Sequence, residues 1–284
     1  MIAITGASGH LGQLTIEALL ERGVPPQEIV AVVRTPEKAT ALAERGIQVR
    51  QGDYTRPETL VSALQGVQQV LLISSSDFAD RVGQHRNVIE AAKQVGATLL
   101  AYTSLLRADT STLSLAADHK ATEELIRASG LPFVFLRNGW YLENYNPAQA
   151  AAQGAVAGSA GEGRVSAASR ADYAAAAAAA LTQPQQAPDT VYELGGDQAF
   201  TLSELAAEVQ TQSGRPVSYQ NMPAADYAQM LLGFGLPAPV AEMLADSDTG
   251  LEKGELYTDS RDLSRLIGRS TTTMPEGVKA ALQG

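Results

Sequence analysis

MIAITGASGHLG, residues 1–12, opens the chain with a short apolar run that ends in three spaced glycines. The amphipathic stretch Leu11–Arg22 follows directly, so the order is strand, glycine turn, helix. Gly6 permits a tight turn, Gly9 lets the backbone approach a pyrophosphate, and Gly12 lets the helix pack close to the strand. Glycines in this setting predict a dinucleotide site, against the alternative of a tight turn without a ligand. The residues expected around the phosphates are Gly6, Ala7, Ser8, Gly9, His10, Leu11 and Gly12.

The composition limits the classes of partner. The chain has 284 residues, of which 45% are hydrophobic and 18% charged, as in ordinary globular proteins. Its formal net charge of −10 argues against a nucleic acid or an anionic membrane as the main partner. Cysteine is absent, which excludes disulfides and cysteine metal sites and fits a reducing compartment. The three histidines lack zinc-site spacing, so we expect no metal.

Targeting segments are not expected. The glycine turn begins at residue 6, which leaves no room for the basic and apolar regions of a signal peptide. No apolar run reaches the roughly 20 residues that span a bilayer. The stretch Ala174–Ala180 is alanine-rich and predicts a closely packed helix instead. We expect a cytoplasmic protein without a membrane partner, and the sequence leaves its oligomeric state open, with a homodimer as one alternative.

Apolar runs alternate with helical patterns through the first half of the chain. The predicted strands are Ile2–Ile4, Ile29–Val33, Ile47–Arg50, Val70–Ile73, Leu99–Tyr102 and Phe133–Leu136. The predicted helices are Leu11–Arg22, Pro36–Arg45, Glu58–Leu64, Arg81–Val95 and Ala116–Ser129. This alternation is typical of βαβ units around a buried parallel sheet, with helices on both faces. We therefore expect an α/β fold with a doubly wound parallel sheet of the Rossmann type.

The pattern loosens after about residue 145. Further elements are expected as a loop or short strand at Gly154–Gly163, helices at Arg170–Leu181, Leu202–Gln212, Ala224–Gly233, Pro239–Ala245, Ser260–Ile267 and Pro275–Leu282, and strands at Val191–Leu194 and near Val217–Gln220. Thr35 and Thr201 are expected to cap helices. We expect residues 1–145 to form the NADP-binding Rossmann domain. Residues 146–284 should form a smaller C-terminal α/β lobe that binds substrate and is partly interleaved with the sheet.

Two polar residues follow the second and third strands. Arg34 stands where NAD-specific sites usually carry an acidic residue, and a guanidinium there can pair with a 2′-phosphate. The position therefore favours NADPH over NADH, against the alternative of an exposed arginine at a strand end. Asp53 can accept a hydrogen bond from the adenine amino group, with Tyr54 beside it. An ordinary turn aspartate is an equal alternative.

The ends of the fourth and fifth strands carry hydroxyl groups. Ser74, Ser75 and Ser76 can line the crevice at the carboxyl edge of the sheet, although a polar loop is the alternative. After the fifth strand, short-chain dehydrogenases place a Tyr-x-x-x-Lys pair as their proton donor. No tyrosine here has a lysine four positions later. His119 is a weak substitute as catalytic residue or ribose contact, and a surface histidine is the more frequent case.

The sixth strand ends in Asn138-Gly-Trp-Tyr141. Asn138 can bind the nicotinamide carboxamide, and Gly139 allows close approach. Trp140 and Tyr141 offer flat surfaces on which an aromatic acceptor can stack over the nicotinamide ring. All four residues are therefore expected near the cofactor, and the two aromatic residues also at the substrate. Trp140 could equally be a core anchor.

These pieces together resemble the atypical short-chain dehydrogenases, in their NmrA-like branch. The motifs that carry the resemblance are TGASGHLG (5–12), VVR (32–34), QGDY (51–54), AYTSL (101–105), IRASGLPFVFLRNGWY (126–141) and SRADYA (169–174). Within the branch, LLISSSD (71–77), LRNGWYLENY (136–145), ADSDTG (245–250) and KGELYTD (253–259) are similar to bacterial NAD(P)H:quinone oxidoreductases and triphenylmethane dye reductases.

The resemblance implies an enzyme that transfers hydride from NADPH to a quinone or a similar electrophilic aromatic. A quinone accepts hydride as an aromatic-stabilised anion and then takes a proton from water, which accounts for the missing Tyr–Lys pair. The alternatives are a triphenylmethane dye reductase and a nonenzymatic NADP(H) sensor, as the regulatory members of the branch are. Without the Tyr–Lys pair, a sugar-nucleotide epimerase is disfavoured.

Overall fold

The computed structural model describes residues 1–77, 79–183 and 189–283. The chain forms two compact units, and neither is a continuous segment. The first comprises Met1–Leu105, Asp118–Asn138 and Arg170–Tyr192; the second comprises Leu106–Ala117, Gly139–Ser169 and Glu193–Gly284. The chain thus passes repeatedly between the units. The predicted roles of residues 1–145 and 146–284, with the second lobe partly interleaved with the sheet, stay predictions.

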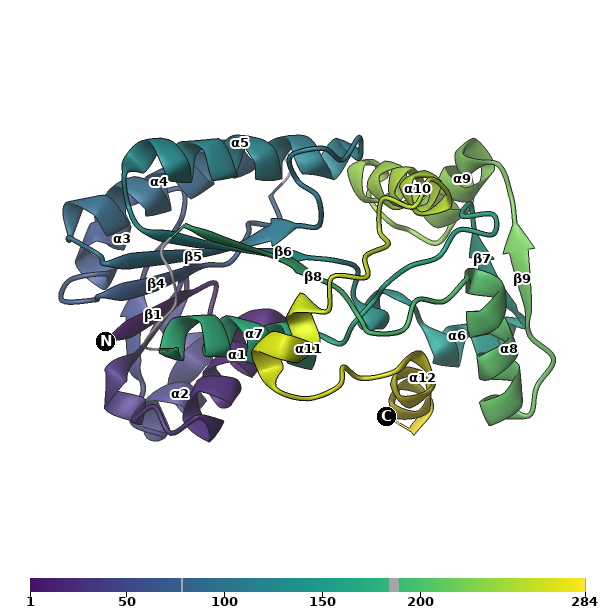
Figure 1. Ribbon diagram of the computed structural model, residues 1–284, viewed down its shortest axis with the longest axis horizontal. Helices are drawn as coiled ribbons and strands as arrows, with labels where there is room; N and C mark the ends of the chain where they lie inside the picture. The colour runs from purple at the N-terminus through teal and green to yellow at the C-terminus, as the bar shows by residue number, and fades with distance from the viewer. Residues whose placement is uncertain (78, 184–188, 284) are drawn as a thin grey trace. The chain divides into compact units, whose positions relative to one another are not determined.

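A seven-stranded sheet organises the first unit (Figure 1). Its strands are β1 (Ile2–Thr5), β2 (Ile29–Val33), β3 (Gln48–Gln51), β4 (Gln69–Leu72), β5 (Leu99–Leu105), β6 (Phe133–Asn138) and β8 (Thr190–Leu194). Their order is β3-β2-β1-β4-β5-β6-β8, and β3 to β6 pair in parallel throughout. The order reverses between β1 and β4, which places a crevice outside the carboxyl ends of these two strands. The predicted Rossmann fold is confirmed.

Helices cover both faces of this sheet. They are α1 (His10–Glu21), α2 (Thr40–Glu44), α3 (Pro57–Ala63), α4 (Arg81–Gln94), α5 (Ser114–Ser129) and α7 (Arg170–Thr182), with short 3-10 turns at Pro26–Glu28 and Pro36–Ala39. Figure 1 shows α3, α4 and α5 over one face and α1, α2 and α7 over the other. Thr35 precedes the second 3-10 turn, but its side chain makes no capping hydrogen bond, so that expectation was wrong.

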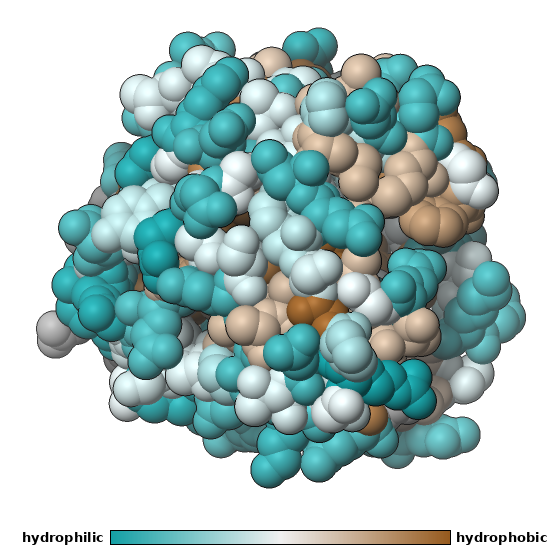
Figure 2. Space-filling model, turned by 90° about the vertical axis from the view of Figure 1, so that its right-hand side faces the viewer, coloured by the Kyte–Doolittle hydropathy of each residue, from teal (hydrophilic) through white to brown (hydrophobic). Residues whose placement is uncertain are grey.

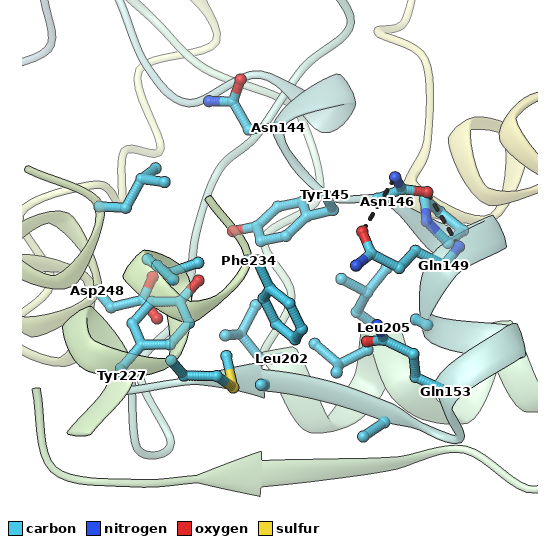
Figure 3. A pocket seen from close by; sticks show the side chains of 18 of the residues that line it. Asn144, Tyr145, Asn146, Gln149, Gln153, Leu202, Leu205, Tyr227, Phe234 and Asp248 are labelled. Atoms are coloured by element: carbon cyan, nitrogen blue, oxygen red, sulfur yellow. Dashed lines mark hydrogen bonds between the residues drawn. The ribbon is translucent and has the colours of Figure 1, made fainter. Parts of the chain in front are cut away.

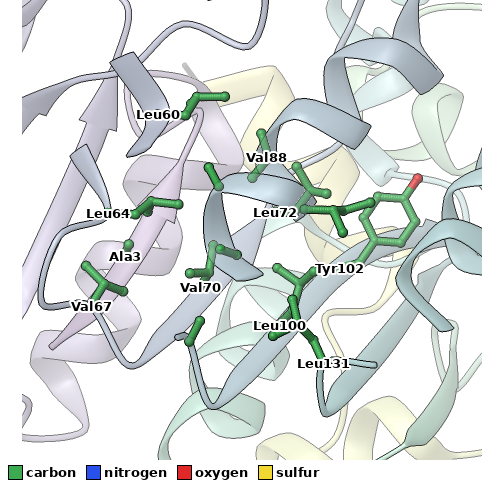
Figure 4. Packing of buried hydrophobic residues seen from close by; sticks show 14 of the residues in the cluster. Ala3, Leu60, Leu64, Val67, Val70, Leu72, Val88, Leu100, Tyr102 and Leu131 are labelled. Atoms are coloured by element: carbon green, nitrogen blue, oxygen red, sulfur yellow. The ribbon is translucent and has the colours of Figure 1, made fainter. Parts of the chain in front are cut away.

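The core on the α3–α4 side is made mainly of aliphatic side chains, with the buried aromatic rings of Tyr102, Phe133 and Phe135. Figure 4 shows Leu60 of α3 and Val88 of α4 meeting Val70 of β4 and Leu100 of β5. Tyr102 closes the cluster and is fully buried. The near-continuous apolar strands of the sequence thus have both faces covered, as expected for a parallel sheet.

On the opposite face, the alanine-rich helix α7 packs against α1. Residues Ala176–Ala180 are at most 1% exposed, which confirms the prediction of a closely packed helix. Alanine side chains let the two helix backbones approach, so that α1 is held against the sheet along its length.

The second unit is built from short elements. Its strands β7 (Ala155–Gly158) and β9 (Ser218–Asn221) pair in parallel. Its helices are α6 (Pro147–Gln153), α8 (Leu202–Ser213), α9 (Ala224–Gly233), α10 (Ala238–Glu252), α11 (Asp262–Ile267) and α12 (Met274–Gln283), with a 3-10 turn, η3, at Leu142–Asn144. Thr201 and Glu204 form the predicted capping box of α8. The sequence did not predict α6, and α10 extends well beyond its predicted end.

The face that carries α8, α9 and β9 is mostly hydrophilic, with apolar side chains gathered in a few patches (Figure 2). Phe234, at the end of α9, is 54% exposed. Among the described residues, no helix combines the length and apolar character that crossing a membrane requires.

A buried ion pair joins α5 to β6 in the first unit. Glu123 accepts hydrogen bonds from Arg137 at both carboxylate oxygens, with N–O distances of 2.8 and 2.7 Å. The Ser104 hydroxyl also donates to Glu123, over 2.7 Å. The Glu123 and Arg137 side chains are only 1% and 4% exposed. Arg127, one turn further along α5, also donates to Glu123, over 3.2 Å. Because water cannot reach the buried Glu123–Arg137 pair, the loss of either partner is costly.

We predict that Glu123→Gln destabilises the protein strongly, because it removes the charged carboxylate that pairs with the buried Arg137 guanidinium. The expected loss in the free energy of unfolding is about 3 kcal/mol. The matched control is Glu124→Gln, at the next position of α5 and exposed. Urea denaturation of both variants checks this. Equal, small losses for the two would contradict the assigned role of the ion pair.

Candidate functional site

The turn between β1 and α1 has the geometry that its glycines predicted. Gly6 has φ +61°, a left-handed conformation that favours glycine. A Cβ on Gly12 would lie 2.6 Å from the Gly6 carbonyl oxygen and 2.7 Å from the Ala7 Cα. The start of α1 therefore packs directly against the turn. The Ala7 N–H donates to the Val32 carbonyl over 3.2 Å and fixes the turn to β2.

The N-terminus of α1 is suited to an anion. Gly9 is the N-cap residue, no side chain caps the helix, and its first turn contains no acidic residue. The N–H groups of His10, Leu11 and Gly12 have no carbonyl one turn earlier within the helix. Such a terminus binds phosphate groups. A Cβ on Gly9 would meet only the Gly6 carbonyl oxygen, at 3.3 Å, so the space beside the backbone is open. Ser8 is exposed next to it.

Arg34 and Asp53 follow β2 and β3, which are neighbours in the sheet. Arg34 is exposed. The Asp53 carboxylate accepts hydrogen bonds from the N–H and hydroxyl of Thr55, over 2.9 and 2.8 Å. The pKa of Asp53 is lowered, mainly by the Thr55 N–H and further by the charge of Arg34. Asp53 thus has the structural role of a turn aspartate, and its contact with adenine stays a prediction.

Tyr54 is not placed beside Asp53 as an adenine contact. Its hydroxyl donates to the Ile73 carbonyl over 2.8 Å and also contacts the Thr5 hydroxyl. The Thr5 hydroxyl donates to the Leu71 carbonyl over 2.9 Å. Tyr54 therefore joins the segment after β3 to the carboxyl ends of β1 and β4. These bonds fix the floor of the crevice at the point where the strand order reverses.

Asn138 is the last residue of β6 and is only 4% exposed. Its Oδ1 atom is buried without a hydrogen-bond partner among the described residues. A buried acceptor without a donor is unfavourable unless a ligand supplies one, and the carboxamide of nicotinamide carries an N–H₂ group. The residue therefore fits the contact predicted for it. The Gly139 N–H that follows donates to the Leu194 carbonyl over 2.8 Å.

A cavity of about 390 Å³ lies within the second unit (Figure 3). Trp140 is one of the residues that line it. Its side chain is 9% exposed, so it is at once a buried anchor and part of the cavity wall. Tyr141 is not among the described residues that line this cavity. It is half-buried, and its backbone forms an isolated β-bridge with Ala168. The stacking roles of both aromatic residues stay predictions.

The cavity has an apolar floor and a polar rim. Leucine, valine, methionine and phenylalanine side chains come from α8 to α10, whereas asparagine and glutamine side chains come from η3 and α6. The sequence reasoning missed Tyr145, Tyr227 and Asp248, which contribute polar groups inside it. Tyr145 and Asp248 lie in LRNGWYLENY and ADSDTG, two of the runs that carried the family resemblance, and that was the signal available.

Comparison with known proteins agrees with this geometry. Residues 6–184 match the family described as NAD(P)H-binding. The chain belongs to the NAD(P)H-binding family. Quinone oxidoreductase 2 of Escherichia coli is 54% identical over 280 residues, which cover 98% of this chain and 97% of that protein. The predicted family resemblance and the nicotinamide cofactor are thereby confirmed.

Solved structures give the same result. The crystal structure of E. coli NADPH-dependent quinone oxidoreductase QOR2 in complex with NADPH has a TM-score of 0.95 and 53% identity, over 99% of both chains. Citrobacter sp. triphenylmethane reductase in complex with NADP(H) has a TM-score of 0.94 and 39% identity, over 99% of this chain and 100% of that chain. This member of the NAD(P)H-binding family therefore shares the whole architecture of both proteins.

The loop after β4 carries the three serines. The Ser74 N–H donates to the Thr103 hydroxyl over 2.8 Å, and the Ser75 hydroxyl donates to Gln84 Oε1 over 2.7 Å. Ser76 is exposed. The Ser75 hydroxyl thus stabilises the loop itself, and cofactor contacts of the three serines stay predictions.

His85, on α4, forms a hydrogen bond with the backbone of this loop. It is fully buried, and its Nε2 accepts from the Ser75 N–H over 2.8 Å. The Thr122 hydroxyl donates to the Asp118 carbonyl over 2.8 Å, so it accepts the proton of His85 Nδ1, 2.9 Å away. The tautomer is thereby fixed with the proton on Nδ1. The Ser75 carbonyl in turn accepts from Arg81 Nε over 2.8 Å.

His119 is buried, so the expectation of a surface histidine was wrong. It is 5% exposed, and its Nδ1 lies 2.7 Å from the Tyr102 hydroxyl. Burial, together with the charge of Arg81, lowers the pKa of His119 to about 3. At neutral pH the ring is therefore an uncharged, hydrogen-bonded part of the core. The expectation failed because packing of α5 on β5, which local sequence does not encode, buries this face of the helix. Its candidate role in proton transfer stays a prediction.

The buried histidines predict an acid-sensitive fold. Burial, then the charge of Arg81, lowers the pKa of both His85 and His119 from 6.5 to about 3. Between these values the unfolded chain binds more protons, so the free energy of unfolding falls as the pH is lowered from 6.5 towards 3. His119→Gln should make this slope shallower by about 1.4 kcal/mol per pH unit. Urea denaturation across the range measures it, with exposed His10→Gln as control. Identical slopes for wild type and His119→Gln would rule out a neutral buried ring.

Proposed function

We propose that the chain reduces quinones with NADPH as the hydride donor. The observation that carries the proposal is the near-full-length match, at more than half of all positions, to E. coli quinone oxidoreductase 2. The glycine turn and the buried, unpartnered Asn138 Oδ1 agree with it, because both suit a nicotinamide dinucleotide. The acceptor is a small molecule, and the expected cytoplasmic location belongs to this proposal as well.

We propose cofactor contacts for residues that follow the carboxyl ends of the strands. The pyrophosphate is proposed to lie on the turn Gly6–Gly12, the 2′-phosphate on Arg34 and the adenine near Asp53. Ser74–Ser76 and Asn138 would contact the nicotinamide half. When bound there, NADPH supplies a hydride equivalent to the acceptor.

The acceptor explains why the chain works without a Tyr-x-x-x-Lys pair. Reduction of a ketone develops charge on an alkoxide, which needs a strong proton donor. Hydride transfer to a quinone instead leaves an aromatic hydroquinone anion, whose charge is delocalised. The similarity to triphenylmethane reductase supports a second class of acceptor, the triphenylmethane dyes, whose cationic carbon accepts hydride without any proton.

We predict that the protein oxidises NADPH in the presence of 1,4-benzoquinone or menadione. Loss of the absorbance band of reduced nicotinamide measures the rate, with a protein-free blank as control. Triphenylmethane dyes in the same assay test the second class. A nonenzymatic sensor would bind NADPH without consuming it, so binding with no turnover on any acceptor would contradict the proposal.

We predict that Arg34→Glu weakens NADPH binding about 10- to 100-fold, because a charge-assisted contact with the 2′-phosphate is lost and replaced by repulsion. NADH, which lacks this phosphate, should be affected much less. Calorimetric titration with both cofactors measures the difference. The control Lys93→Glu makes the same charge change at the exposed C-terminal end of α4, at the opposite edge of the sheet. Equal losses for NADPH and NADH would refute the assignment.

A further inference from the structure

The cavity in the second unit places three titratable side chains on one side, apart from Glu143 and the asparagine and glutamine side chains that also line it. Tyr145 precedes α6, Tyr227 lies on α9 and Asp248 on α10. Figure 3 shows the Tyr145 hydroxyl directed towards the side of the cavity that Tyr227 and Asp248 occupy, with Phe234 below it. Three elements that are far apart in the sequence thus bring their polar groups together.

Tyr145 offers a hydrogen-bond donor that the protein does not use. Its hydroxyl is buried and has no hydrogen-bond partner among the described residues. Its ring is held edge-on against Phe200, with centroids 5.9 Å apart, so the hydroxyl is fixed in place. Burial, with the nearby charge of Asp248, raises the pKa of Tyr145 well above its usual value, and the group stays protonated. A fixed, unsatisfied donor is unfavourable in the free protein unless a ligand supplies an acceptor.

Asp248 contributes a carboxyl group to the same cavity. Its side chain is 8% exposed, and its Oδ2 accepts from the Ser159 N–H over 2.8 Å. Burial raises the pKa of Asp248 to about 6, partly opposed by the Ser159 hydrogen bond. Its charge acts on three neighbouring titratable groups, Tyr145, Tyr227 on α9 and Tyr219 on β9. Because all three are uncharged at neutral pH, none supplies a countercharge that would hold Asp248 ionised.

A quinone matches these groups. It carries two hydrogen-bond acceptors and no donors, so its site must provide the donors. Its flat ring suits apolar and aromatic walls such as Trp140 and Phe234. Trp140 also lies only two positions after Asn138, the residue proposed to contact the nicotinamide. The wall of the cavity thus includes a residue close in the sequence to the proposed nicotinamide contact.

We propose that this cavity binds the quinone, that the Tyr145 hydroxyl donates a hydrogen bond to one carbonyl oxygen, and that Asp248 protonates the reduced product. The inference rests on the proposed quinone reductase function and adds to it a binding cavity and a proton donor.

Reduction of the quinone to the hydroquinone takes one hydride and one proton. Hydride transfer delivers two electrons and one proton, oxidises NADPH to NADP⁺ and converts the quinone to a hydroquinone monoanion. The O–H bond of the Asp248 carboxyl group then breaks, and its proton forms the second hydroxyl of the hydroquinone. The Asp248 carboxylate takes a proton back from water. The Tyr145 hydroxyl keeps its proton and stabilises the developing negative charge.

Tyr145→Phe tests the hydrogen bond, because it removes only the hydroxyl. We expect the KM for menadione to rise about fivefold, as for the loss of one neutral hydrogen bond, with the NADPH affinity unchanged. The melting temperature should not fall, because the variant removes a buried group without a partner. The control is Tyr257→Phe, whose side chain is 39% exposed and outside this cavity. A lower melting temperature with an unchanged KM would show a structural hydroxyl and overturn this part of the inference.

Asp248→Asn tests the proton donor, because an amide oxygen can still accept from the Ser159 N–H but the group has no acidic proton. Wild-type kcat should fall as the pH rises through about 6, the pKa of Asp248. The variant should lack this dependence and have a kcat severalfold lower at a pH one unit below that pKa, because its product anion must then take its proton from water. The control Asp226→Asn changes an exposed carboxylate on α9.

The outcomes separate the two proposals. A wild-type enzyme that reduces quinones, together with Tyr145→Phe and Asp248→Asn variants that behave like their controls, would overturn this inference alone. A wild-type protein that binds NADPH but reduces no quinone would overturn the proposed function, and this inference with it. If Asp248→Asn does not fold, Tyr145→Phe decides the inference through its KM.

Discussion

The close approach of helix α1 to the turn after β1 is the constraint on which the cofactor site depends. Gly12 leaves no room for a Cβ beside the Gly6 carbonyl, and Gly6 itself has a left-handed backbone. This packing puts the uncapped N-terminus of α1 at the carboxyl end of β1, beside the reversal in strand order. In a protein with net charge −10, long-range attraction does not favour an anionic cofactor. Short-range hydrogen bonds from fixed backbone N–H groups must hold the pyrophosphate instead.

The polar groups of the protein divide into two sets. Those that support the crevice are satisfied within the chain: His85 and Arg81 hold the backbone of Ser75, and Glu123 neutralises Arg137. These bonds fix the strand ends without ligand. The Oδ1 of Asn138 and the hydroxyl of Tyr145 are buried without partners among the described residues. Because an unsatisfied buried group destabilises the free protein, its persistence is best explained by a ligand that completes the hydrogen bond. One of the two lies at the proposed nicotinamide site, the other in the proposed quinone cavity.

The central strands could be predicted from the sequence because β1, β2, β4 and β6 are short runs rich in apolar residues. The capping box of Thr201 likewise marks a helix start locally. Helix α6 was missed because Pro147–Gln153 is short and lacks an apolar periodicity. The burial of His119 was misjudged because its neighbours Asp118 and Lys120 are polar, and only packing against Tyr102 shows which way it faces. The arrangement of Tyr145 and Asp248 around one cavity depends on how α6, α9 and α10 come together. No spacing in the sequence encodes that arrangement.

The most direct test of the account is calorimetric titration of NADPH into Gly9→Ala. The added Cβ would meet only the Gly6 carbonyl oxygen, at 3.3 Å, a tight contact that a small shift of the turn relieves. Gly9 has φ −78°, which alanine adopts, so the fold should be preserved while the methyl group occupies the space proposed for the pyrophosphate. Gly233→Ala, where a Cβ meets nothing within 4 Å, is the matched control. The account predicts an unchanged melting temperature and a loss of about tenfold or more in NADPH affinity for Gly9→Ala alone. Equal affinity for wild type and Gly9→Ala would contradict it.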